Sequence, residues 1–260
     1  RLTDEVSASF TYENAYVDWT FRSAPSRSES GLTSSVKGSL TYDSRDNRLF
    51  PTSGQYHSTS VEYADEIVGS ENLFTRTRVN SRYYHPLFWR FVFKGAVRYG
   101  VVLPHAGQPV PTFERFFVGG INSVRGFERH SLGPRTKIGA VDPYNQLLLV
   151  NTGGDEELVL NLEIEFPIFE QVGIKGVVFA DLGNAFCGKP DCSPNDPSLR
   201  THGSLLGDPL EAFEGLRSSW GFGFRWFSPI GPLRFEWGFP IGRKPGERAQ
   251  VFEFTIGSFF

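Results

Sequence analysis

The sequence predicts an all-β protein, a transmembrane antiparallel β-barrel, from three observations. Apolar and polar residues alternate with a period of two along ten segments of the 260-residue chain. Aromatic residues make up 15% of the chain, yet the mean hydropathy of −0.26 resembles that of a soluble protein. No stretch approaches ~18 consecutive apolar residues, which excludes a transmembrane helix. Strands with one face toward lipid and one toward a wet lumen combine these properties, whereas a soluble sandwich buries its apolar faces.

The ten predicted strands fall into two runs of five, separated by a long segment. The first five cover 6–12, 36–42, 56–63, 74–84 and 89–101, with 14–31 read mainly as a polar loop. The last five cover 158–166, 173–181, 217–226, 233–239 and 249–260. The longer of these strands, with about nine to thirteen residues, suit tilted strands in a ~30 Å hydrocarbon core. No helix is predicted, and the chain is expected to be a single domain over residues 1–260.

Two long loops interrupt the strands, at 104–156 and at 184–214. The first contains FERFFVGGINSVRGFERHSLG at 113–133, which is too long and too rich in glycine for a tight hairpin. Glycines let the backbone pass where a side chain would clash, and Arg125 offers a planar five-donor fork beside Gly126. We expect this loop to fold back into the lumen. The alternative is a solvated surface loop with an incidental arginine.

Composition narrows the function. A net charge of −3 without a basic run gives no sign of a nucleic-acid partner. The five histidines lie in separate segments, without a nucleophile and base around them, so we expect neither an enzyme nor a cofactor. Cys187 and Cys192 lie in the polar segment CGKPDC and predict a disulfide rather than a metal site. The chain has no Met, so Arg1 is expected to begin a mature or truncated piece.

Four stretches resemble one family. They are GGINSVRGF in the central loop, the F-x-D-x-G pattern at 179–183, DSRDNRLFPTSG at 43–54, and the end from SPIGPLRFEWGFP to FEFTIGSFF. In this order and spacing they are similar to the superfamily of BamA, TamA and two-partner-secretion translocators, which includes the Sam and Toc channel proteins of mitochondria and chloroplasts. The resemblance covers nearly all of the chain.

The resemblance implies a 16-stranded barrel in the bacterial outer membrane, with this chain as its last ten strands and periplasmic domains before the barrel. Ten strands alone are not expected to close. The implied partners are membrane lipid, unfolded outer-membrane proteins and accessory lipoproteins. In such families a lateral seam lies between the first and last strands, and only the last is present here. The seam residues are then Phe254, Ile256, Gly257 and Phe260, with Gly257 permitting a kink.

The resemblance also implies that the loop is anchored through Arg125. Glu163 and Asp181 are predicted to face inward on consecutive strands, with Glu165 as a second candidate partner. A buried guanidinium needs such charged partners. The alternative is that these carboxylates only line a wet lumen. The anchor prediction comprises Gly119, Gly120, Val124, Arg125, Gly126, Phe127, Glu163, Asp181 and Gly183.

The expected function is non-covalent assembly of other β-barrels into the outer membrane, through pairing of nascent strands with the last strand. The alternatives are a translocator of the same superfamily, which exports a passenger through its lumen, and a self-contained small pore. The fold alone does not decide between them.

Overall fold

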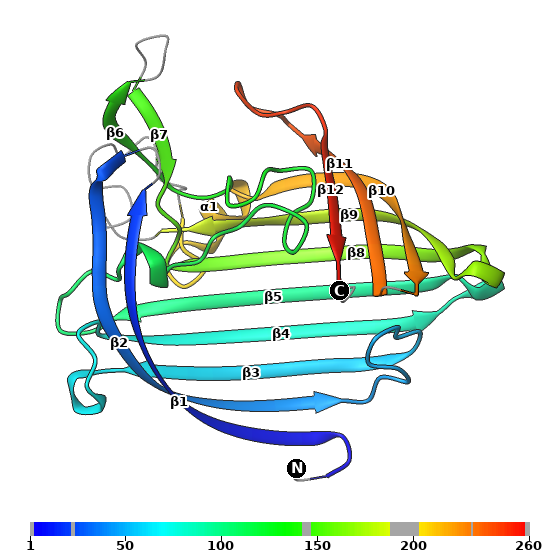
Figure 1. The fold of residues 1–260 in the computed structure, drawn as a ribbon, viewed down its shortest axis with the longest axis horizontal. Coiled ribbons are helices and arrows are strands. Elements are labelled where there is room, and N and C mark those ends of the chain that lie inside the picture. Colours follow the sequence, from blue (N-terminus) through cyan, green and yellow to red (C-terminus); the bar gives the residue numbers. More distant parts are fainter. Residues whose placement is uncertain (1–2, 22–23, 142–146, 188–202, 230, 258–260) are drawn as a thin grey trace.

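The computed structural model describes residues 3–21, 24–141, 147–187, 203–229 and 231–257, and it confirms the all-β prediction. Ten strands form one antiparallel sheet in the order β1-β2-β3-β4-β5-β8-β9-β10-β11-β12, and β6 pairs with β7 separately (Figure 1). The strands are β1 Val6–Phe21, β2 Ala24–Asp43, β3 Gly54–Ala64, β4 Phe74–Pro86, β5 Val92–Pro104, β6 Arg135–Val141, β7 Leu147–Asn151, β8 Glu156–Phe169, β9 Ile174–Phe186, β10 Arg217–Ser228, β11 Gly231–Ile241 and β12 Val251–Ile256. The helical elements are α1 Pro209–Glu214 and the 3-10 turns Glu66–Val68, Phe88–Arg90, Thr112–Glu114 and Glu170–Val172.

The ten predicted strands match the ten strands of the large sheet, but the hairpin β6–β7 and the helix α1 were not predicted. β7 reads LLLVN, a continuous apolar run without the alternation that marks a half-buried strand. The helix has only six residues, too few to show a helical period, although Asp208 caps it by accepting a hydrogen bond from the Glu211 amide. Both elements are therefore too short for periodicity to detect.

The predicted loop at 14–31 is wrong. β1 and β2 instead run on as one long hairpin, paired without a break from Val6↔Tyr42 to Thr20↔Ser28. A serine-rich segment reads as a loop, but two neighbouring extended chains satisfy each other's backbone groups whatever their side chains.

Two strand boundaries also differ from the prediction. β5 starts at Val92 rather than residue 89, because Trp89 and Arg90 adopt left-handed backbone angles (φ +51° and +66°) in the turn after β4. The last strand is shorter than the predicted 249–260, and residues 258–260, including Phe260, lie outside the described residues.

The two ends of the sheet carry different connections. At one end the chain turns back within a few residues, at 87–91 between β4 and β5 and at 170–173 between β8 and β9 (Figure 1). The opposite end carries the longer segments, above all 105–155 between β5 and β8. This asymmetry is typical of outer-membrane barrels, which have short periplasmic turns and longer extracellular loops.

The two faces of the sheet divide by polarity. On β8, Leu162 is 51% exposed on the outer face, while its neighbour Glu163 is 1% exposed on the inner face. On β10, Trp220 points outward and Arg225 is fully buried. A soluble sheet would bury its apolar face, so this polarity is the one expected of a sheet whose outer face meets lipid. No helix among the described residues is long and apolar enough to cross a membrane.

The sheet is open within the described residues, because its edge strands β1 and β12 are not paired with each other. The long loop packs against the inner face (Figure 1). Two apolar clusters attach it there, one to β8 and β9 and the other to β3, β4 and β5. The first contains Val118, Val124, Phe127, Leu132, Val159 and Ala185. The second contains Ala64, Phe74, Val102, Val110 and Phe116.

Candidate functional site

The loop tip at 119–126 lies against the inner faces of β8, β9 and β11. Gly126 has φ +86°, and its backbone touches that of Gly238 on β11. A Cβ on Gly126 would lie 2.9 Å from the Gly238 carbonyl carbon, and a Cβ on Gly238 would lie 2.3 Å from the Gly126 nitrogen. Both distances are below ordinary contact, so this approach requires glycine on both sides.

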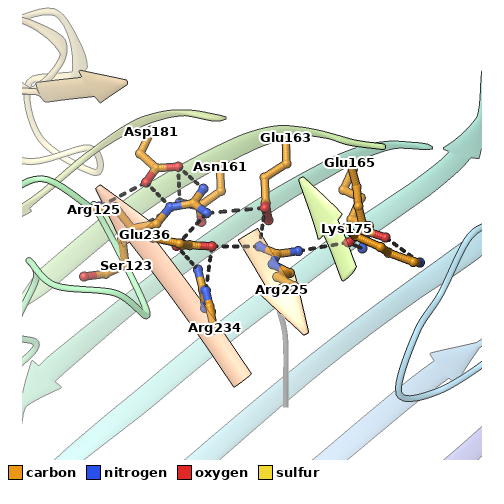
Figure 2. A network of polar contacts seen from close by, with 11 residues as sticks. Ser123, Arg125, Asn161, Glu163, Glu165, Lys175, Asp181, Arg225, Arg234 and Glu236 are labelled. Atoms are coloured by element: carbon orange, nitrogen blue, oxygen red, sulfur yellow. Dashed lines mark hydrogen bonds and ion pairs between the residues drawn. The ribbon is translucent and has the colours of Figure 1, made fainter. Parts of the chain in front are cut away.

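Asp181 on β9 holds Arg125 in the bidentate geometry that suits a guanidinium and a carboxylate. Arg125 donates from Nε to Oδ2 and from Nη2 to Oδ1, each at 2.7 Å, and its backbone N–H donates to Oδ2 at 3.0 Å. Asn161, opposite Asp181 on β8, donates to Asp181 Oδ1 at 2.8 Å and to the Ser123 carbonyl at 2.6 Å (Figure 2). The same carboxylate thus fixes both the side chain and the backbone of the loop tip.

Arg125 reaches two further carboxylates and one aromatic ring. Its Nη1 lies 3.3 Å from Glu163 Oε2 and 3.3 Å from Glu236 Oε2. Its guanidinium carbon lies 3.6 Å from the ring centroid of Phe179, a cation–π contact. Arg125 is 1% exposed, so these groups replace its entire hydration shell.

A second buried arginine, Arg225 on β10, extends the network along the inner face (Figure 2). It pairs with Glu163, lies 3.1 Å from Glu236 Oε1 and lies 3.3 Å from Glu165 Oε2. Arg234 contacts the same Glu236 carboxylate, with its Nε 2.7 Å from Oε1. Glu163 and Glu236 are therefore each shared between Arg125 and Arg225.

Glu165 closes the other end of the network. Lys94 Nζ donates to its Oε2 at 2.7 Å, and Lys175 Nζ donates to its Oε1 at 2.8 Å. The network consists of five cations and four carboxylates: Arg125, Arg225, Arg234, Lys94 and Lys175 with Asp181, Glu163, Glu236 and Glu165.

This arrangement stabilises charge that would otherwise be costly to bury. Moving an ion out of water costs roughly several kcal/mol of free energy. Only closely placed opposite charges and hydrogen bonds offset that cost. Burial alone would lower the pKa of Arg125, but Asp181, Glu163 and Glu236 outweigh it and hold the pKa well above its ordinary value. Each cation faces acceptors and each carboxylate faces donors, so the site is built to hold a loop in place.

The remaining anchor residues lie around Arg125. Val124 and Phe127 are buried on either side of it. Gly183 on β9 leaves the space that Val124 fills, because a Cβ there would lie 2.9 Å from Val124 Cγ2. Gly119 and Gly120 begin the turn that leads to Arg125, with φ +112° and +96°.

The sequence offered Glu165 as a second candidate partner of Arg125, but in the structure Glu165 pairs with Arg225 instead. It also missed Glu236, Arg225, Arg234, Asn161, Phe179 and Gly238. The available signal was alternation, since the charged members of this set occupy inward positions of their strands. Alternation does not reveal which inward residues meet, because that depends on register and on where the loop docks.

The seam residues lie on and beyond β12. Phe254 and Ile256 point outward and are half-exposed. Gly257 has φ +134°, and its N–H donates to the Pro232 carbonyl at 2.9 Å. Cys187 is buried at the end of β9, whereas Cys192 lies outside the described residues, so the disulfide stays a prediction.

Residues 3–260 match the Omp85 superfamily domain. The outer membrane protein assembly factor BamA of Nitratidesulfovibrio vulgaris is 31% identical over 223 residues, which cover 85% of this chain and 25% of that protein. BamA of Neisseria meningitidis serogroup B is 28% identical over 227 residues, which cover 83% and 27% respectively. The sorting and assembly machinery component 50 homolog of Mus musculus is 32% identical over 113 residues, which cover 43% and 24%.

The crystal structure of Haemophilus ducreyi BamA lacking POTRA domains 1–3 has the same fold, with a TM-score of 0.71 and 24% identity over 89% of this chain and 43% of that one. The chain spans about a quarter of the length of the curated BamA relatives it matches. The matched region nevertheless includes most of this chain. Because the superfamily domain matches nearly every residue, this chain belongs to the Omp85 superfamily, as a BamA-like protein of the bacterial outer membrane.

Proposed function

We propose that this chain forms the last ten strands of a 16-stranded barrel, and that the whole protein folds and inserts other β-barrel proteins into the outer membrane. The two bacterial relatives are named outer membrane protein assembly factors, which supports this proposal. The process is non-covalent and needs no cofactor. Its partners are membrane lipid, unfolded outer-membrane proteins, accessory lipoproteins and the periplasmic domains of the full-length protein.

The observation that carries the proposal is the burial of Arg125 among three carboxylates on the inner wall. An arginine at 1% exposure with bidentate pairing is not an incidental surface residue. The pairing fixes the loop in the lumen and joins it to β8, β9 and β11, so the strands next to the seam keep a defined shape while the seam itself opens.

The seam in this proposal is the free edge of β12. With six residues, β12 is the shortest described strand of the large sheet, and β11 is its one partner there. Each unpaired backbone N–H or C=O group in lipid costs roughly several kcal/mol of free energy. Pairing of a nascent strand with this edge removes that cost and is therefore favourable. This is β-augmentation at a membrane edge. Gly257 ends the strand and permits the kink that weakens it.

Site-specific photo-crosslinking tests this proposal. A photo-reactive amino acid replaces Phe252 on β12, Val79 on the outer face of β4, or Asn80 on its inner face, in the full-length protein in liposomes. An unfolded outer-membrane barrel protein is then added and the mixture is irradiated. We expect the substrate to crosslink from position 252 and from neither position on β4.

Other outcomes oppose the proposal. Crosslinking mainly from position 80 would indicate passage of the polypeptide through the lumen, as in a translocator. Equal crosslinking from positions 79 and 252 would indicate non-specific contact of the substrate with the lipid-facing surface. Absence of crosslinks from all three would remove the seam as the point of entry.

A further inference from the structure

The last strand has little support within the sheet. β12 pairs with β11 over six residues, from Val251↔Gly238 to Ile256↔Leu233. On its outer face, the Phe254 ring lies 4.8 Å from the Phe235 ring of β11 in a tilted contact. Among the described residues, further support for β12 comes from its inner face, where Glu253 lies.

The inner face of β12 meets a rigid turn of the loop. The Ser123 N–H donates to the Gly120 carbonyl at 3.0 Å, and the Gly119 N–H donates to Ser123 Oγ at 2.8 Å. The left-handed angles of Gly119 and Gly120 make this turn possible, and a Cβ on Gly119 would lie 2.5 Å from the Glu128 carbonyl oxygen. The double glycine is thus explained by the turn and not by the Arg125 network.

The turn presents one backbone donor to the last strand. The Ile121 N–H donates to Glu253 Oε1 at 2.9 Å. Because the turn is closed on itself, this donor is held in place before the contact forms, and little entropy is lost on making it. A hydrogen bond to a charged carboxylate is about twice as strong as one between neutral groups.

The same turn is also tied to the opposite walls. Arg98 on β5 donates from Nη1 to the Asn122 carbonyl at 3.2 Å, and Asn161 on β8 holds the Ser123 carbonyl. The turn therefore bridges β5 and β8 to β12 across the inner space. A second loop contact, Arg248 with Glu128, has both side chains largely exposed and contributes little.

We propose that Glu253 is a positioning residue, which fastens the last strand to the loop turn and sets how readily the seam opens. This proposal rests on the proposed function only where it concerns assembly. The physical claim is that one carboxylate on β12 is braced from inside the barrel by a loop that Arg125 holds independently.

The test uses the full-length protein in liposomes, with hydrogen exchange of residues 251–256 measured by mass spectrometry. Glu253→Ala removes the acceptor, and exchange should accelerate about ten-fold, the change that corresponds to ~1.4 kcal/mol. Glu253→Gln keeps an acceptor oxygen but loses the charge, so its rate should lie between that of the native protein and that of Glu253→Ala. Thr255→Ala, on the same face of the same strand, is the matched control. Gly119→Ala strains the turn at a φ of +112°, where the added Cβ meets Glu128 and Ser131 and not the carboxylate, and should accelerate exchange as Glu253→Ala does.

Assembly of a reporter barrel by the same samples completes the test. The proposal is supported by faster exchange and an altered assembly rate in Glu253→Ala, an intermediate exchange rate in Glu253→Gln, and native behaviour of Thr255→Ala. Native exchange in Glu253→Ala overturns it. Faster exchange with a native assembly rate also overturns the positioning role, while the proposed function stands. If the native protein assembles no reporter, the proposed function fails and the exchange data still decide whether the brace exists.

Discussion

Arg125 and Asp181 are separated by 56 residues in the chain, yet their side chains join through two hydrogen bonds of 2.7 Å. This contact ties the tip of a long loop to the inward face of β9. Glu163 and Glu236 both pair with Nη1 of the same guanidinium. Gly126 lets the loop backbone lie directly on β11. The loop and three strands therefore form one unit, whose strength is measurable.

Asp181→Asn should destabilise the barrel, because it removes the bidentate carboxylate while keeping the shape of the side chain. Breaking a buried pair costs roughly 3–5 kcal/mol, and water in the lumen would reduce this value. The free energy of unfolding in urea, followed by gel mobility of the full-length protein, measures the effect. Glu170→Gln is the control, because its ion pair with Arg90 is exposed. Equal unfolding curves for the two variants would contradict the anchor.

Gly126→Ala should displace the loop, because the added Cβ would lie 2.9 Å from the Gly238 backbone at a strained φ of +86°. Overpacking of this kind costs typically about 1–3 kcal/mol. The readout is protease cleavage within 113–133, which should accelerate. Gly38→Ala on β2 has open space around its Cβ and should behave as native protein. Unchanged cleavage in Gly126→Ala would show that the loop does not rest on β11.

The connection between β11 and β12 should loosen in acid. Glu247 accepts hydrogen bonds from Arg217 Nη1 at 2.9 Å and Nη2 at 2.8 Å. Burial alone would raise the pKa of Glu247, but hydrogen bonds from Arg217 and the Lys244 backbone N–H outweigh it and lower the pKa below its ordinary value of 4.5. Stability from a depressed carboxyl pKa is present above the unfolded value and lost as pH falls through the folded one.

Hydrogen exchange of residues 242–250 checks this prediction by comparing native protein with Glu247→Gln at each pH. At pH 7 the variant should exchange faster. At an acid pH below the lowered folded-state pKa, where the native carboxylate is protonated, the difference should shrink. A difference of the same size at both pH values would mean that the charge of Glu247 does not hold this connection.

Cys187 and Cys192 should be disulfide-bonded in the native protein. Maleimide labelling of the unreduced, denatured protein is expected to modify neither cysteine, and reduction should expose both. Replacing both by Ser should change assembly little, because so small a closed loop restricts few residues of the unfolded chain. Labelling of both thiols before reduction would refute the bond.

Which side chains of each strand point to the inner face and which to the outer face could be predicted, because this is a local property of the sequence. Each residue of a barrel strand meets either lipid or lumen, so the alternation around Glu163 or Arg225 reports its face directly. The proximity of Arg125 to Asp181 also followed, since both lie in stretches that resemble one family. The end of β1 and the serine-rich start of β2 were not predictable in this way, because cross-strand pairing and not composition makes them strands.

The sharing of Glu236 between Arg125 and Arg225 could not be predicted from the sequence. Glu236 lies 111 residues beyond Arg125, and the contact depends on how far the sheet curves and where the loop docks. The pairing of Glu253 with Ile121 spans 132 residues and requires a backbone donor, which no side-chain pattern reports. Contacts across the interior of a barrel are set by the whole sheet.

The central claim is that the loop is anchored by the fork of Arg125 and that assembly requires this anchor. The most direct measurement is the rate at which the full-length Arg125→Lys protein in liposomes assembles a reporter barrel. Lysine keeps the charge but cannot make the bidentate contact with Asp181. Arg129→Lys, an exposed position of the same loop, is the control. We predict that Arg125→Lys assembles the reporter at least ten-fold more slowly while Arg129→Lys matches native protein; native rates for both variants would contradict the account.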